Sequence, residues 1–342
     1  MENKKRLDWI DMCRGIVMIL VVLGHTLTYN SNLRFIIFTF HMPVLFVISG
    51  FVFKLRLLKT SVPKYVKRLL MPMYLAGVAL LIYRIIRMTL EKQALADIVY
   101  WIKRTIVAVV FASGVDKPKG FPWVHAFGML WFLAAMFWAM MLMVALFNNI
   151  RRDYIRAIIC IFGTIIGVMI SRYLWLPMNF DIALIVLTYL YFGYYLRKVD
   201  MDNKKIMLPL IIICAIIWVV NYTNGGKIEL AQRKFTLHIL SYLASISGSL
   251  LVMYASKLAY RKNKVTDALA FIGRNSMTVL VIHFIDSNMI PWEVILKGNP
   301  SEKKYIITWF ILRMVFIAIV LTVWVLSLIH ISEPTRLRCI SY

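Results

Sequence analysis

Long apolar runs alternate with short polar segments along the whole chain. About 20 predominantly apolar residues are needed for an α-helix to cross the hydrocarbon core of a bilayer. Runs near this length predict ten spans, at residues 10–29, 34–53, 69–90, 128–148, 155–171, 181–196, 206–221, 236–256, 267–289 and 306–328. We therefore expect an all-α integral membrane protein with about ten transmembrane helices.

One further apolar stretch, residues 95–112, carries Lys103 and Arg104 at its centre. Charged side chains at that position are costly in lipid. We therefore expect an interfacial or partly buried helix here, and not an eleventh span.

The loops between the runs differ in their content of Lys and Arg, which favours the cytoplasmic side of a membrane. Five alternate segments carry 20 of these residues, namely 1–9, 54–68, 149–156, 197–205 and 257–264. The short loops 30–33, 172–180, 222–236 and 291–305 carry seven. This asymmetry predicts a cytoplasmic N-terminus. The first run is long and lacks a small-residue cleavage site, so we expect it to remain as the first span.

Composition supports a multi-pass membrane protein, and the cell (plasma or inner) membrane is its expected location. Hydrophobic residues make up 61% of the chain and charged residues 16%, against about half and a quarter in soluble domains. A formal charge of +24 often indicates nucleic-acid binding. Here the basic residues lie between apolar runs, as cytoplasmic anchors do. The lipid bilayer is therefore the expected partner, and nucleic acid is not.

Several ionisable side chains fall inside the predicted spans, where they usually face a cavity or a partner. Asp11 and Arg14 lie three residues apart in the first span, on one helical face that lets them pair. His25 follows Arg14 by eleven residues, about 16 Å along a helix axis. Helix capping by Asp11 and snorkelling of Arg14 to the inner interface are the alternatives to a functional role.

Three histidines are expected at similar depth in the outer half of the membrane. They are His25, His41 on the second span and His283 on the ninth; Trp131, which opens the fourth, shares their layer. A neutral imidazole can accept a proton from an alcohol near neutral pH. The alternative is a set of core histidines. No HExxH or carboxylate-rich set accompanies them, so we expect no metal site. Gly50, Gly128 and Gly273 are interpreted as packing or turn glycines.

Basic residues crowd the predicted cytoplasmic ends of the first three spans. Anchoring and contact with lipid headgroups explain most of this charge. Guanidinium groups in it can also bind the phosphates of an anionic nucleotide donor. The cluster comprises Arg14, Lys54, Arg56, Lys64, Lys67 and Arg68.

Five stretches of the chain together resemble the membrane acyltransferase-3 family, and most closely its fucose 4-O-acetylase-like branch. RLDWIDMCRGIVMILVVLGHT places Arg14 and His25 as in the family's first span, and TFHMPVLFVISGFVFK places His41 and Ser49 as in its second. VKRLLMPMY contains Arg68. GMLWFLAAMF surrounds Trp131, and FIGRNSMTVLVIHF ends beside His283.

The resemblance implies a ten-helix membrane O-acyltransferase. Such an enzyme passes an acyl group, usually acetyl, from cytoplasmic acyl-CoA to a hydroxyl of a cell-envelope or exopolysaccharide sugar. It implies no bound cofactor, since acyl-CoA is a donor substrate and the glycan is the acceptor. The oligomeric state does not follow from it.

For the site, the resemblance implies catalysis by His25, helped by His41, and donor binding by Arg14 and Arg68. Further possible site residues are Asp11, Ser49, Trp131 and His283. Direct transfer and transfer through an acyl-histidine use the same residues, so both remain open.

We expect a single membrane domain over residues 1–328. The last stretch, SLIHISEPTRLRCISY at 327–342, resembles adapter-derived sequence and is expected to be non-native.

Two other functions fit the apolar pattern. A multi-span carrier or exporter of an anionic or sugar solute would line its path with the same polar residues, and it would release no CoA. A structural or sensory membrane protein would explain the spans but would not explain three histidines at similar depth.

Overall fold

The computed structural model describes residues 7–28, 31–296 and 303–337 of the chain, which are almost entirely helical. The α-helices are α1 Asp8–Thr26, α2 Asn32–Phe38, α3 His41–Phe51, α4 Leu58–Tyr65, α5 Met71–Leu90, α6 Leu95–Phe111, α7 Trp131–Asn149, α8 Asp153–Ser171, α9 Phe180–Ile185, α10 Leu187–Leu196, α11 Lys204–Thr223, α12 Ile239–Ala259, α13 Lys264–Arg274, α14 Ser276–Met289, α15 Trp292–Leu296 and α16 Lys303–Leu337. Short elements complete the fold: η1 Val66–Leu70, η2 Pro177–Asn179, η3 Leu230–Gln232, and the strands β1 Ile228–Glu229 and β2 Lys234–Phe235.

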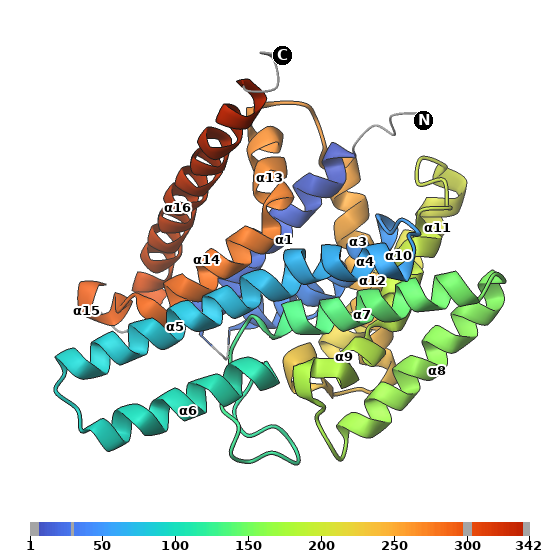
Figure 1. The fold of residues 1–342 in the computed structure, drawn as a ribbon. Coiled ribbons are helices and arrows are strands. Elements are labelled where there is room, and N and C mark those ends of the chain that lie inside the picture. Colours follow the sequence, from blue (N-terminus) through green and yellow to red (C-terminus); the bar gives the residue numbers. More distant parts are fainter. Residues whose placement is uncertain (1–6, 29–30, 297–302, 338–342) are drawn as a thin grey trace.

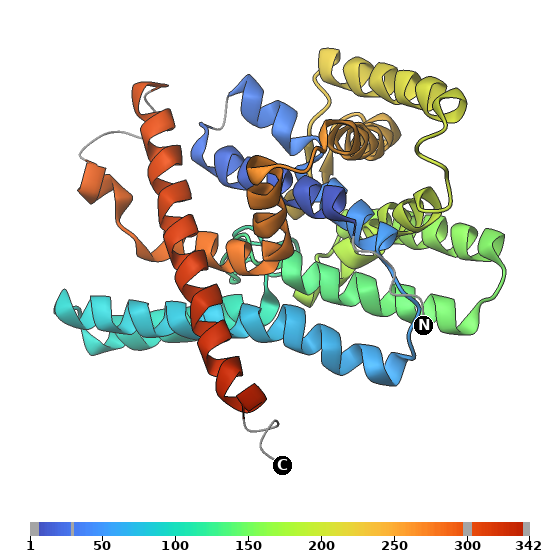
Figure 2. The same ribbon diagram turned by 90° about the horizontal axis from the view of Figure 1, so that it is seen from above.

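The helices form one bundle around α1, α3 and α7 (Figure 1). α16 lies along one side of the bundle, and α11 and α12 lie on the opposite side in both views (Figures 1 and 2). The α12 helix also packs against α1 and α3. α5 and α6 run side by side as a hairpin that extends away from the bundle.

The spans predicted from the apolar runs are confirmed. In the described part of the chain, eight helices are long and apolar enough to cross a membrane, or up to ten if each of two bent pairs forms one span. The bends correct the expectation of continuous spans at 181–196 and 267–289. α9 and α10 meet at 48°, and α13 and α14 meet at 76°. At the second bend, the side chain and the backbone N–H of Asn275 both donate to the carbonyl of Phe271, near the end of α13.

The third span is longer than predicted, because α4, η1 and α5 continue one another from Leu58 to Leu90. A π-helical turn, Val66–Leu70, joins α4 to α5. π-Helical turns are rare in proteins overall, but where they occur they are often near functional sites. α4 and η1 pack along α7, whereas the later part of α5 pairs with α6. Residues 95–111 form the expected helix, and its interfacial position remains a prediction.

Glycines allow α1 and α13 to cross in backbone contact. A Cβ atom on Gly273 would lie 1.7 Å from the carbonyl oxygen of Asp11, and one on Gly15 would lie 1.9 Å from that of Leu269. Small residues at helix crossings allow such close approach in membrane proteins. The crossing fixes α1, which carries His25, against the helix that leads into α14.

A second crossing of this kind joins α3 to α10. A Cβ on Gly50 would meet the carbonyl oxygen of Leu190 at 1.9 Å, and one on Gly193 would meet that of Val47 at 1.9 Å. The interpretation of Gly50 and Gly273 as packing glycines is therefore confirmed.

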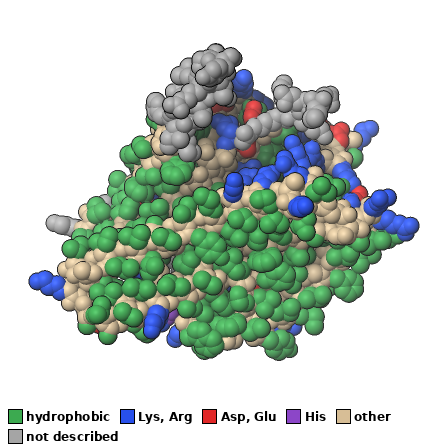
Figure 3. Space-filling model, viewed as in Figure 1, with side chains coloured by type: hydrophobic (Ala, Val, Ile, Leu, Met, Phe, Trp, Pro, Cys, Tyr) green, Lys and Arg blue, Asp and Glu red, His purple; other side chains and the backbone are tan. Residues whose placement is uncertain are grey.

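The molecular surface is mostly apolar. Hydrophobic side chains cover most of the face in Figure 3, while Lys and Arg side chains gather along its upper right, where Figure 1 shows α4. The exposed basic residues of that region are Lys54, Arg56, Lys59, Lys64, Lys67 and Arg68. An apolar belt with basic residues at one edge is typical of a helical protein embedded in a membrane.

The predicted non-native tail, 327–342, lies partly in α16, which continues to Leu337. Residues 338–342 lie outside the described residues, so the expectation about this tail stays a prediction.

Candidate functional site

A cavity lies at the end of α1, enclosed by α2, α3, the start of α7 and the loop segments after α6 and α11. With its mouth it holds about 660 Å³ that no atom fills. Its polar and aromatic lining includes His25, Arg34, His41, Trp131 and Glu229. We call this space the histidine cavity.

Two local features bring His25 and His41 to this cavity. α1 ends at Thr26, one residue after His25, whose side chain is exposed toward the cavity. α2 and α3 are interrupted at Thr39 and Phe40, so His41 becomes the first residue of α3. Its Nδ1–H donates to the carbonyl of Ile37 at 3.0 Å, because a carbonyl can only accept. His41 therefore keeps a lone pair on Nε2.

Phe38 lies between the two histidines. Its ring centroid is 6.0 Å from that of His25 and 4.5 Å from that of His41. The Arg34 guanidinium covers the same ring at 3.9 Å, a cation–π distance. The two imidazoles therefore line the same cavity, and both contact the Phe38 ring.

Arg34 and Glu229 give the cavity a charged part. Glu229 comes from β1, in the loop between α11 and α12, and is half-buried. Burial raises the pKa of the Glu229 carboxyl, against the opposing fields of Arg34 and Lys234. A carboxyl and a guanidinium lining one space can hydrogen-bond a polyhydroxylated ligand as acceptor and donor.

His283 lies behind His25, with 5.7 Å between their ring centroids. It comes from α14, and its Nδ1 lies 3.2 Å from Oδ2 of Asp286. Both side chains are completely buried. The bend between α13 and α14 brings this pair beside the end of α1.

Trp131 opens α7 and forms part of the cavity wall. The chain before it turns at Gly128, which has a φ of +84° as expected for a turn glycine. Gly114 packs against the indole, where a Cβ would lie 2.7 Å from it. The Asn179 side chain donates to the carbonyl of Trp131 at 3.3 Å.

The remaining predicted site residues lie outside the lining of the histidine cavity. Asp11 and Arg14 approach to 3.7 Å, which confirms their pairing. α1 begins at Asp8 with Leu7 as its N-cap, so Asp11 lies in the first turn and capping does not explain it. Ser49 donates its hydroxyl to the carbonyl of Leu45 on its own helix. Arg68 is exposed on the π-helical turn.

A buried ion pair fixes the loop that carries Glu229. Arg233 donates to both carboxylate oxygens of Asp181, at 2.8 and 3.0 Å, and to the side-chain oxygen of Asn179 at 3.0 Å. Its guanidinium also lies 4.1 Å from the Trp175 ring. The two charged side chains are 2% and 0% exposed, so their charges compensate each other away from water. This pair joins the loop to the start of α9.

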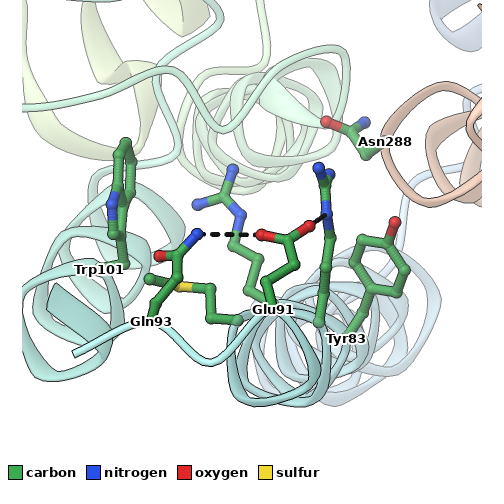
Figure 4. Close-up of a pocket in the computed structure, with 8 residues that line it drawn as sticks. Tyr83, Glu91, Gln93, Trp101 and Asn288 are labelled. Atoms are coloured by element: carbon green, nitrogen blue, oxygen red, sulfur yellow. Dashed lines mark hydrogen bonds and ion pairs between the residues drawn. The ribbon is translucent and has the colours of Figure 1, made fainter. Parts of the chain in front are cut away.

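A second, open pocket, which with its mouth holds about 730 Å³, lies between α5, α6 and α14. Figure 4 shows Trp101 and Tyr83 on its two sides, with Glu91 between them bonded to Arg87 and Gln93. Its described lining includes none of the residues predicted for the site. It is therefore separate from the histidine cavity.

Among the described residues, no group of three His, Cys, Asp or Glu side chains lies close enough to hold a metal ion.

Sequence reasoning missed Arg34, Glu229 and Arg313. Arg34 opens the second predicted span and is easily counted as an anchor. Glu229 is the only acidic residue between 222 and 236, which was the available signal. Arg313 lies inside the last predicted span, where an ionisable residue indicates a buried partner.

Comparison with known families gives one match over nearly the whole chain. The family model described as an acyltransferase domain, acyltransferase-3, matches residues 7–330. No curated protein and no solved structure matches. Apolar helices that can span a membrane, together with this match, identify a multi-pass membrane protein with an acyltransferase domain. The chain belongs to the membrane acyltransferase-3 family.

Proposed function

We propose that this protein is a membrane O-acetyltransferase of the fucose 4-O-acetylase-like type, located in the cell (plasma or inner) membrane. It moves an acetyl group from cytoplasmic acetyl-CoA to a hydroxyl of a cell-envelope or exopolysaccharide sugar. The observation that carries the proposal is the exposed imidazole of His25 in a cavity lined by residues of α1, α2, α3 and α7. A cytoplasmic N-terminus, as the loop charges predict, places this cavity toward the acceptor side.

In the proposed reaction, His25 takes the proton of the acceptor hydroxyl while the oxygen of that hydroxyl attacks the thioester carbonyl carbon. The C–O bond forms, the C–S bond breaks, and the proton leaves with the CoA sulfur. His41 lies across Phe38 with its Nε2 lone pair available. It assists by accepting a hydrogen bond from the acceptor. Arg34 and Glu229 are suited to bind the remaining sugar hydroxyls.

The donor would reach His25 from the other end of α1. Arg14 lies three helical turns before His25, about 16 Å away along the axis. Acyl-CoA carries its thioester at the end of an extended pantetheine arm, so phosphates and acyl carbon can lie at different depths. Arg14, together with Arg68 on the π-helical turn, supplies guanidinium groups for those phosphates.

Membranes containing the protein should release CoA from labelled acetyl-CoA and transfer the label to glycan. Membranes without the protein provide the control. Uptake or export of a sugar with no CoA release would instead support the carrier hypothesis. Labelled glycan identified by mass spectrometry would also reveal the acceptor.

Arg14→Lys should weaken donor binding by more than fivefold, because lysine keeps the charge and loses the planar fork that binds two phosphate oxygens at once. A fivefold change corresponds to about 1 kcal/mol. The measurement is the KM for acetyl-CoA, with Lys59→Arg on exposed α4 as a matched control. A KM for acetyl-CoA within twofold of the wild-type value would contradict donor binding by Arg14 and support its interpretation as a membrane anchor.

A further inference from the structure

The buried pair His283–Asp286 has a defined arrangement of protons. A carboxylate only accepts hydrogen bonds, so the Nδ1 of His283, 3.2 Å from Oδ2 of Asp286, carries the proton. The other ring nitrogen, Nε2, then carries a lone pair. A carboxylate bonded to one nitrogen of an imidazole fixes the tautomer and the orientation of the ring in this way.

Two other helices place a hydrogen-bond donor and a cation beside this carboxylate. The indole N–H of Trp292 on α15 donates to Oδ1 of Asp286 at 2.7 Å. The Arg313 guanidinium on α16 approaches Oδ2 at 3.7 Å. An isolated carboxylate is very costly in an apolar interior, and a guanidinium and a hydrogen-bond donor offset that cost.

The lone pair on Nε2 of His283 accepts no hydrogen bond from the described residues. This nitrogen is also buried. Polar atoms in such positions are uncommon, because each forfeits the hydrogen bond it had in water. The ring of His25 lies beside that of His283, with 5.7 Å between the ring centroids. Of the two histidines, His25 lines the cavity and His283 does not.

We propose that Asp286 and His283 are positioning residues for His25, a role that rests on the proposed function and deepens it. When substrates occupy the cavity, the Nε2 of His283 accepts the N–H of His25. The second nitrogen of His25 is thereby held as a lone pair directed at the acceptor hydroxyl. Catalytic hydrogen bonds are often longer in empty sites and shorten when the substrate binds.

The proton count is unchanged by this arrangement. The acceptor proton moves to His25 and then to the CoA sulfur, while His283 keeps its Nδ1 proton and Asp286 its negative charge. The transient imidazolium of His25 is stabilised by its hydrogen bond to His283 and by the carboxylate behind it. This stabilisation acts in the transition state, so its loss should reduce kcat and leave the KM for acetyl-CoA unchanged.

Asp286→Asn tests the proposal in the full-length protein. The amide keeps an oxygen for Trp292 but offers an N–H₂ to His283, which moves the His283 proton to Nε2 and confronts His25 with a second donor. In serine proteases, the same exchange of carboxylate for amide behind the catalytic histidine imposes the wrong tautomer and costs about 10⁴-fold in kcat. Here the exchange lies one ring further from the base, so we expect a loss of about 10²-fold in kcat. Asn288→Ala, two residues along α14, is the matched control and should keep its kcat.

Two further variants separate positioning from structure. His283→Ala should lose as much kcat as Asp286→Asn, and the double variant should lose no more, because the residues act as one unit. Trp292→Phe keeps a ring for its contact with Phe316 and removes only the N–H donor. It should lose about tenfold in kcat, and it decides the question if Asp286→Asn does not fold.

All rates are compared per amount of folded, detergent-soluble protein. A kcat within twofold of the wild type for Asp286→Asn and His283→Ala, or for Trp292→Phe where these do not fold, overturns the positioning role. So does a loss confined to the KM for acetyl-CoA. A wild type that releases no CoA overturns the proposed function itself, which distinguishes the two failures.

Discussion

His25→Ala should leave less than one per cent of the wild-type acyl transfer. A general base contributes about 10²–10⁴ in rate, and His25 is the histidine whose side chain is exposed in the cavity. The variant should still insert and fold, because packing holds a membrane bundle together and one imidazole adds little to it. The measurement is label transferred from acetyl-CoA per amount of folded protein.

Two companion variants complete that experiment. Leu23→Ala, two residues earlier on α1 and outside the cavity lining, should transfer normally. His41→Ala should lose less than His25→Ala if it orients the acceptor, and equally much if it is the base. Near wild-type transfer by both histidine variants would make them core residues and contradict the proposed reaction.

Arg233→Met should destabilise the protein by about 3–5 kcal/mol, the cost of leaving a buried carboxylate without its cation. Asp181 is completely buried, and its two oxygens accept their hydrogen bonds from Arg233. The free energy of unfolding in mixed micelles measures the loss. Acyl transfer should fall as well, because the freed loop carries Glu229 and η3, which line the cavity.

An exposed ion pair provides the control for this variant. Glu91→Gln removes the Arg87–Glu91 pair, which should contribute little to stability because water screens exposed charges. Adding Asp181→Asn to Arg233→Met should recover part of the lost stability by removing the uncompensated charge. Equal stabilities of Arg233→Met and Glu91→Gln would contradict a structural role for the buried pair.

The positions of the spans could be predicted because crossing a bilayer imposes one requirement, a sufficiently long apolar run, that the chain displays locally. The bends could not. At the 76° bend, the side chain of Asn275 donates to the carbonyl of Phe271. At the interruption before His41, Thr39 accepts a hydrogen bond from Trp218 of α11. A hydropathy pattern contains neither contact.

The candidate site divides in the same way. Helical rise alone predicts that His25, His41, His283 and Trp131 lie in one layer, and the structure brings them around one cavity or directly behind it. The loop that carries Glu229 to the cavity is held by a salt bridge from Arg233 to the distant Asp181. Such contacts between distant segments arise from packing and leave no periodic signal.

The contact of Asp286 with Arg313 also has a consequence for biogenesis. Arg313 lies on α16, which is synthesised after the other helices around the site and is among the least covered candidate spans. Until the ribosome has released this helix into the bilayer, the carboxylate beside His283 has no guanidinium to neutralise it. The nascent chain therefore holds an incomplete site until α16 inserts and docks against α14.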